Sequence, residues 1–324
     1  MALYKKIRAL AVKHEAALGT GIATTVSDFE AWDVQYTPSI EMISRSDLGS
    51  LSPPADVPGQ ASGQVTFKTY LRPGAVAGAA PIVLERLMPM CGYAQALEVF
   101  SPSGLVPTVS GVLPTTGTIS SYENGLQKTI SGAMGTARIV MVVGQPIVFE
   151  WTFTGRYEGV GLGVALVVDA TLVTQTLTDA ANIPMKFASS VLTIGGAAPG
   201  CIESLTIDLG NEVVLRPCAT ESTGFAHAVI TGRRVTGSWN PESRVVATED
   251  VHALWLAGTA EALSLTAVGV AADAGDTTLT IAAPQAQRTN VQPGERNGIQ
   301  TDQIDFLCHK SATAGNDELT FSFA

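Results

Sequence analysis

The sequence predicts a mainly β protein made of two tandem sheet domains. Three observations favour this class. Charged residues make up only 15% of the chain, short runs of β-branched and aromatic residues alternate with Gly- and Pro-rich turns, and the order of these runs recurs in the two halves. A chain of 324 residues has ample length for two domains of ordinary size. We place them at residues 1–186 and 187–324, each with one short helix.

The N-terminal segment is expected to begin with a helix. Within residues 3–18, Ile7, Leu10, Ala11 and Leu18 recur at helical spacing, and a glycine follows them. The segment Gly19–Ser27 would then form an arm of small residues.

Strands are predicted where side chains alternate with a period of two. Aromatic and polar residues alternate over residues 149–154. Over residues 64–70, Val65 and Phe67 would face one side, and Thr66, Lys68 and Tyr70 the other. Each segment would bury one face in a sheet. The Pro-, Gly- and Ser-rich stretch Leu48–Gly63 between two such strands is expected to be a long loop.

One interior helix is predicted at Pro81–Gly92. Proline is favoured at the start of a helix, the apolar residues that follow it fall on one face, and Gly92 provides a stop. Pro89 is expected to kink or shorten this helix.

An internal repeat relates the two halves. The segment SIEMISR matches NEVVLRP, VTFKTYLRPG matches AVITGRRVTG, and a helical segment follows in both, PIVLERLMPMCGY and VATEDVHALWLAG. The offset of roughly 150 to 165 residues is about one domain. We interpret it as a tandem duplication of one β-domain. If the ancestral domain formed a ring of six, three duplicated chains would complete the ring, and a homohexamer is the alternative.

Composition argues against several functions. The net charge of −10 disfavours the wrapping of nucleic acid, which needs clustered Lys and Arg, whereas an acidic surface repels DNA. No apolar run reaches membrane-spanning length, so we expect a protein made in a cytoplasm and no membrane contact. The four cysteines form no C-x-x-C pair and are expected to be buried free thiols.

The sequence contains no motif typical of catalysis or metal binding. The histidines lack a second His or a carboxylate at ligand spacing, and no acid pair or catalytic triad stands out. We therefore predict no catalytic residue, no cofactor and no metal site. Glu249 and Asp250 are expected to cap the second helix rather than to act as a pair of acids.

Four stretches resemble the tail tube proteins of long-tailed bacteriophages, of the two-domain type with roughly 300 residues. They are LAVKHEAALGTGIATT, TFKTYLRPGAVAGAAPIVLERLMPMCGYA, SYENGLQKTISGAMGTARIVMVVGQPIVFEWTFTGRY and, in the distal half, ITGRRVTGSWNPES with IAAPQAQRTNVQPGERNGIQTDQIDFLC. Together they cover most of the chain in the order of the family. The chain departs from the family at Pro89, where a small or polar residue is usual.

The resemblance implies a β-sandwich or half-barrel in each repeat and sheets that continue between subunits, so that the subunits close a ring. These rings would stack into the tube through which phage DNA passes without specific binding. The other partners implied are the tape measure protein and the tail terminator and distal tail proteins, in the tail of the virion.

Candidate site residues follow from this comparison. Ring-stacking or interface residues are expected in the arm, the long loop and an Arg pair: Thr20, Leu48, Leu51, Pro53, Pro54, Asp56, Arg233 and Arg234. The two arginines could form a DNA patch or salt bridges between subunits, and the acidic total favours salt bridges. Candidates for the lumen are Glu150, Asp302 and Asp305. The alternatives are a phage decoration or receptor-binding β-sandwich protein and, with less support, an enzyme on a β-scaffold.

Overall fold

The computed structural model describes most of the chain. The described residues are 8–46, 49, 52–76, 78–103, 115–123, 125–157, 166–168, 171–177, 182–268, 278–311 and 315–324. All structural statements below refer to these residues.

Strands dominate the described chain, and two short helices interrupt them. The strands are β1 (Arg8–His14), β2 (Val26–Ser27), β3 (Trp32–Ile43), β4 (Val57–Tyr70), β5 (Tyr93–Ala96), β6 (Val99–Pro102), β7 (Gly117–Glu123), β8 (Leu126–Val142), β9 (Val148–Arg156), β10 (Leu166–Val168), β11 (Thr174–Gln175), β12 (Val191–Ile194), β13 (Ile202–Asp208), β14 (Asn211–Pro217), β15 (Phe225–Arg233), β16 (Thr236–Pro241), β17 (Ala260–Val268), β18 (Thr278–Arg296), β19 (Ile299–His309) and β20 (Thr320–Phe323). The helices are α1 (Ile82–Leu87) and α2 (Val251–Leu256), and a 3-10 turn covers Pro89–Cys91.

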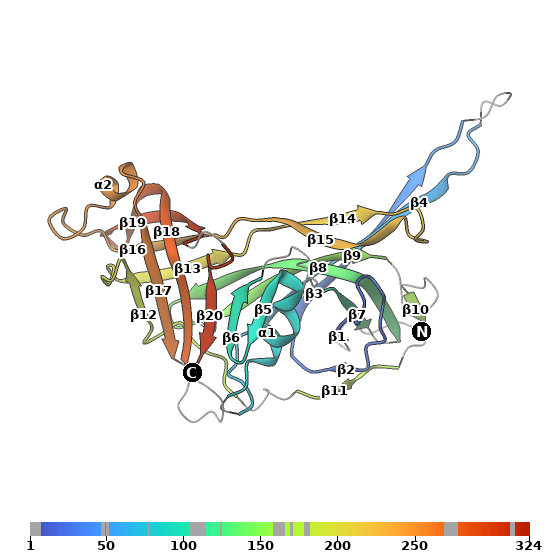
Figure 1. Cartoon of the computed structure of the whole chain (residues 1–324), viewed down its shortest axis with the longest axis horizontal. Helices are drawn as coiled ribbons and strands as arrows, with labels where there is room; N and C mark the ends of the chain where they lie inside the picture. Colours follow the sequence, from blue (N-terminus) through green and yellow to red (C-terminus); the bar gives the residue numbers. More distant parts are fainter. Residues whose placement is uncertain are drawn as a thin grey trace.

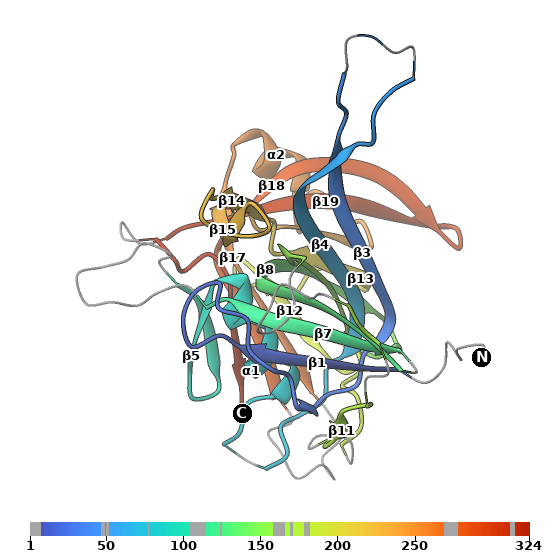
Figure 2. The same ribbon diagram turned by 90° about the vertical axis from the view of Figure 1, so that its right-hand side faces the viewer.

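One large sheet runs through the molecule (Figures 1 and 2). It contains sixteen strands in the order β3-β4-β9-β8-β13-β16-β19-β18-β20-β6-β5, and β1, β7, β10, β12 and β17 pair alongside this path. The pairings within it are antiparallel, and β8 joins β13 where the two halves of the chain meet. The predicted mainly β class is therefore confirmed.

Alternating aromatic side chains fill the core under this sheet. Phe149, Trp151 and Phe153 on β9 are buried, and neighbouring ring centroids lie 5.3 and 6.1 Å apart. On β16 and β19, Trp239 and Phe306 pack with centroids 4.5 Å apart. Side chains of both halves belong to the same buried cluster. The predicted alternation is confirmed, since every second side chain of β9 enters this core.

The order of paired strands recurs in the two halves. In the first half β1, β7, β8, β9, β4 and β3 pair in series. In the second half β12, β17, β18, β19, β16 and β13 pair in the same series. A short helix follows β4 in one half and β16 in the other. The repeated sequence segments agree with this order only in part, because NEVVLRP and most of AVITGRRVTG lie in β14 and β15 and not in β13 and β16, the counterparts of β3 and β4.

The N-terminal segment corrects one expectation. Its described part is not a helix, because Arg8–His14 forms β1 and pairs with β7 from Arg8↔Glu123 to His14↔Gly117. Four successive residues of β1, Ala9–Val12, are buried. A strand buried on both faces shows no alternation, so its apolar run also fits a helical pattern, and pairing with β7 decides the outcome.

The predicted interior helix is confirmed, and so is its interruption. Helix α1 ends at Leu87, and a 3-10 turn begins at Pro89. Gly92 ends the turn in the left-handed region with φ of 77°. In α2, the Asp250 carboxylate accepts a hydrogen bond from the Ala253 amide at 2.8 Å, which is the predicted capping role.

The long loop is shorter than predicted. Strand β4 begins at Val57 and pairs with β3 out to Ile43, so Val57–Gly63 belongs to a strand. Small or polar residues fill positions 59–63 of this segment and lower its apparent strand propensity, and pairing with β3 overrides that tendency.

Candidate functional site: a polar sheet face and two hairpins

One face of the central sheet carries polar side chains from both halves. Residues paired in an antiparallel ladder point to the same face. The ladder Lys68↔Glu150↔Arg138↔Asp208 crosses from β4 through β9 and β8 to β13. Lys68 Nζ lies 2.8 Å from a Glu150 carboxylate oxygen, and Arg138 lies 4.0 Å from the other oxygen. Basic residues thus partly neutralise the acid on this face.

A second ladder places Asp305 on the same face as Glu150. It runs Val140↔Thr206↔Ser238↔Asp305↔Asn290 from β8 to β18. Val140 lies two residues from Arg138 on β8, and residues two apart in a strand share a face. The polar face therefore continues across the boundary between the halves.

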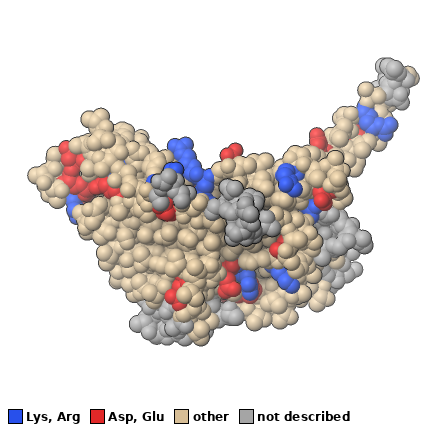
Figure 3. All heavy atoms as spheres, viewed as in Figure 1, with Lys and Arg blue, Asp and Glu red and all other residues tan. Residues whose placement is uncertain are grey.

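Asp302 does not belong to this face. Asp302 lies two residues before Ile304 and four before Phe306 on β19, so it points to the same side of the strand as these two core residues. Its exposed fraction is 6%. Asp302 and Asp305 point to opposite sides of β19, because successive residues of a strand alternate in direction, and the assignment of each to a lumen stays a prediction. Figure 3 shows that the visible surface is largely free of charged residues, with acids and bases in small groups.

Two long hairpins extend beyond this sheet and differ in their surroundings. The docked hairpin consists of β14 with β15, which continue from β13 and into β16. The projecting hairpin consists of residues 40–43 of β3 with residues 57–61 of β4, beyond the pairing of β4 with β9. In Figure 1 the docked hairpin runs above β8 and β9, whereas the projecting hairpin leaves the body of the molecule at the upper right.

Asn211 holds the base of the docked hairpin on the first half. Its side-chain amide donates to the carbonyl oxygens of Cys91 at 2.8 Å and Gly135 at 2.9 Å. Its backbone N–H donates to Thr136 Oγ1 at 3.2 Å. These bonds join the hairpin to β8 and to the turn after α1.

Arg156 holds the tip of the docked hairpin. Its buried guanidinium, at the end of β9, lies 2.8 Å from a Glu221 carboxylate oxygen and donates to the Phe225 carbonyl at 3.4 Å. It also donates to the Gly19 carbonyl. A single side chain therefore connects the N-terminal segment, the central sheet and the hairpin tip. Nothing in the sequence pattern around Arg156 or Asn211 had marked them as contact residues.

His227 of β15 is enclosed by the same contacts. A Cβ atom on Gly132 would lie 3.0 Å from His227 Cβ, so glycine allows this close approach. Burial lowers the pKa of His227, and the positive charges of Arg216 and Arg156 add to this effect.

The projecting hairpin carries apolar side chains that are exposed in a single chain. Ile40, Met42, Ile43 and Val57 have exposed fractions between 43% and 56%. A second exposed apolar group lies before and within α2, at the other end of the molecule in Figure 1. There Val245 and Val246 are each 71% exposed, and Leu256 is 91% exposed. Exposed apolar patches of this kind mark interaction surfaces.

The predicted interface residues have varied surroundings. Thr20, Pro53 and Asp56 are exposed and Pro54 is half-buried, while Leu48 and Leu51 lie outside the described residues.

The two arginines of the predicted pair have different surroundings. Arg233 is largely buried and lies 2.8 Å from Glu318 of the same chain, and its expected role in a salt bridge between subunits stays a prediction. It also donates to the carbonyls of Gly92 and Ser103. Arg234 is exposed.

The cysteines are free, as predicted, but only two are buried. Cys91 and Cys308 are buried, Cys218 is half-buried and Cys201 is exposed. Burial raises the pKa of Cys308 to about 12. Among the described residues, no group of three or more His, Cys, Asp and Glu could hold a metal ion.

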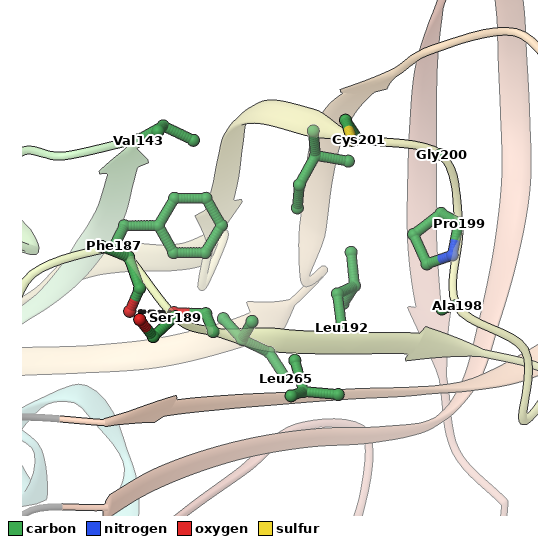
Figure 4. A pocket seen from close by; sticks show the side chains of 13 residues that line it. Val143, Phe187, Ser189, Leu192, Ala198, Pro199, Gly200, Cys201 and Leu265 are labelled. Carbon is green, nitrogen blue, oxygen red and sulfur yellow. Dashed lines mark hydrogen bonds between the residues drawn. The ribbon is translucent and has the colours of Figure 1, made fainter.

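An apolar cavity of about 370 Å³ lies beside β12 (Figure 4). Phe187, Leu192, Pro199 and Leu265 contribute to its wall, and Cys201 is the one titratable side chain in its lining. It offers no pair of groups that could exchange a proton with a substrate. No helix in the described part of the chain is long and apolar enough to cross a membrane.

The molecule is thus a β-sheet protein with one polar sheet face and with an exposed apolar surface at each end, on the projecting hairpin and at α2. Over residues 6–323, the chain matches the family model described as phage tail tube protein. The chain therefore belongs to the phage tail tube protein family. No curated protein matches it.

Proposed function

We propose that this chain polymerises into stacked rings that form the tail tube of a long-tailed bacteriophage and the conduit for DNA ejection. The observation that carries the proposal is the family match over residues 6–323. The continuous sheet supports it, because its two ends expose different surfaces. Such a chain can join head to tail, and head-to-tail contacts close into rings when the rotation permits.

The ring would contain three chains with pseudo-six-fold symmetry. The recurring strand series supports a division into two tube domains, residues 1–186 and 187–324, that arose by duplication. Three chains would then present six similar sheet units around the axis. A homohexamer of whole chains is the alternative, and end views of rings distinguish the two.

The polar face of the sheet would line the lumen. Glu150 and Asp305 lie on it with hydroxyl-bearing neighbours such as Thr152 and Ser238. The net charge of −10 supports weak repulsion of DNA phosphates, which would let the genome slide without adhering. The expected partners in the tail of the virion are the tape measure protein and the tail terminator and distal tail proteins, and the chain would be made in the host cytoplasm.

Electron microscopy of the purified protein at high concentration tests the proposal. Hollow tubes or stacked rings with three-fold or pseudo-six-fold end views are expected. Dispersed particles that never assemble, alone or with an initiating tail-tip fraction, would contradict it and favour a decoration or receptor-binding protein.

A further inference from the structure

The junction between the two halves of one chain shows how one sheet unit joins the next. Strand β8 pairs with β13 in antiparallel register, from Arg138↔Asp208 to Val142↔Ser204. The docked hairpin continues from β13 and contacts β8 and β9. The junction therefore has two parts, a strand-to-strand ladder and a hairpin laid over the neighbouring unit.

Each part of the junction has a counterpart that makes no such contact within one chain: the strand edges of β3 and β18 correspond to the ladder, and the projecting hairpin corresponds to the docked hairpin. Strand β3 ends the strand order and pairs only with β4 among the described strands. On β18, pairing with β17 stops at Gln287, while β19 pairs along the opposite side to Arg296. The side of β18 after Gln287 therefore has no strand partner in the described chain. On β8 this is the side that β13 occupies, beyond the end of β7.

The register of the missing ladder follows from equivalent residues. Phe149-Glu150-Trp151 on β9 and Ile304-Asp305-Phe306 on β19 both place an acid between two core residues. Arg138 stands opposite that acid in the first half, and Asn290 stands opposite it in the second. Asn290 is thus the equivalent of Arg138.

The same comparison identifies the partner residue on β3. Phe67 faces Trp151, and Gly237 faces Phe306, so the preceding residues Thr66 and Thr236 are equivalent. Thr66 pairs with Gln35, and Thr236 pairs with Asp208. Gln35 is therefore the equivalent of Asp208, the residue that faces Arg138 across the internal junction.

We propose that the contact between neighbouring chains of a ring repeats this internal junction, with β3 of one chain pairing with β18 of the next in the register Gln35↔Asn290. This proposal rests on the proposed function and specifies its partner, a second copy of the chain. Core-facing residues match in this register, because Val34 and Val291 become paired and both pack against the core in the single chain. The free edges are thereby covered, as exposed strand edges require.

The projecting hairpin would lie over β18 and β19 of the neighbour, as the docked hairpin lies over β8 and β9. An open groove is present beside β19, between that strand and β15, and its lining includes Arg234, Leu307 and His309. The apolar side chains of Ile40 and Met42, exposed by 47% and 56%, would be covered by this contact. Burial of such surface supplies about 25 cal/mol for each Å² removed from water.

Disulfide trapping tests the register. In a Cys201→Ser/Cys218→Ser background, the double substitution Gln35→Cys/Asn290→Cys should give covalent dimers and trimers after mild oxidation. Directly opposed residues have Cβ atoms about 4.5–5.5 Å apart, close to the roughly 3.5–4.5 Å of a disulfide. Matched controls are Arg138→Cys/Asp208→Cys, which should close within one chain, and the out-of-register pair Gln35→Cys/Glu295→Cys, which should not link chains.

The outcomes separate this inference from the proposed function. Covalent trimers that coincide with ring-shaped particles support both. Rings that form without linkage of Gln35→Cys to Asn290→Cys overturn the register and leave the tube function intact. Complete absence of assembly overturns both.

A second variant tests the hairpin. Ile40→Asp/Met42→Asp alters exposed side chains and should leave the monomer folded while reducing ring formation at least tenfold. Leu97→Asp, at a position 87% exposed in the β5–β6 turn, is the control and should assemble normally. If the hairpin variant forms closed rings that fail to stack, the hairpin acts between rings, and its placement on the neighbour is refuted.

Discussion

Replacement of Arg156 should release the docked hairpin from the first half of the chain. The guanidinium is nearly enclosed, with a side-chain exposed fraction of 5%, and contacts Glu221, Phe225 and Gly19. Arg156→Met keeps most of the aliphatic volume but removes the charge and its donors. The change therefore isolates the polar contribution of this contact.

The expected loss is about 2–4 kcal/mol in the free energy of unfolding. Hydrogen bonds to charged groups contribute roughly 1.5–3 kcal/mol each, and removing one partner of a fully buried pair costs about 3–5 kcal/mol. Glu221 is 39% exposed and can regain water, which lowers the estimate. Arg138→Met is the control, because Arg138 is 54% exposed and its loss should cost less than about 1 kcal/mol.

Two measurements on dilute, unassembled protein check this prediction. Urea unfolding followed by tryptophan fluorescence gives the change in stability, and hydrogen exchange reports on β14 and β15. Exchange in Phe225–Arg233 should accelerate in the Arg156→Met variant and stay unchanged in the control. A loss below about 1 kcal/mol with unchanged exchange would refute the view that Arg156 anchors the hairpin.

Three further predictions concern backbone strain, acid sensitivity and thiol reactivity. Gly210→Ala should destabilise the protein by more than about 2 kcal/mol, because φ is +58° and the new Cβ would lie 2.0 Å from a backbone oxygen. The control Gly298→Ala, at φ of +81° with open space around the new Cβ, should cost about 1 kcal/mol. Urea titrations that rank the two variants in the opposite order would contradict this prediction. His227 has a lowered pKa in the folded state. The stability that its neutral form contributes is therefore fully present above the pKa of the unfolded state, about 6.5, and is lost as pH falls through the folded-state pKa. In the His227→Gln variant the free energy of unfolding should depend less on pH over that range. An unchanged pH dependence of the free energy of unfolding would contradict this prediction. A thiol reagent should modify exposed Cys201 quickly and buried Cys308 only on unfolding; equal rates in mass spectra would show that the core opens readily.

Several local features could be read from the sequence because they depend on neighbouring residues. The alternation around Trp151 predicted a half-buried strand, since period two is a property of the strand itself. Pro81 and Pro89 predicted where the helix begins and breaks, because proline restricts its own backbone and removes a donor. Asp250 capped its helix for a similarly local reason.

Other features depended on contacts between distant segments. The N-terminal run around Leu10 fits a helix by spacing, but its pairing with β7 makes it a strand. Asp302 and Asp305 look equivalent in the sequence, and only the direction of each side chain in the folded sheet separates them. Arg233 finds Glu318 of its own chain, 85 residues away in sequence, a pairing that no local pattern encodes.

The sequence by itself determined the mainly β class and the resemblance to the tail tube family. Composition, periodicity and turn residues act over a few positions, so they can be recognised without coordinates. Only the tertiary structure decided that β8 joins β13, that one long hairpin is docked while the other projects, and that β3 and β18 retain open edges. Register and edge exposure arise from hydrogen bonds between segments far apart in the chain, and a single sequence carries no direct record of those distances.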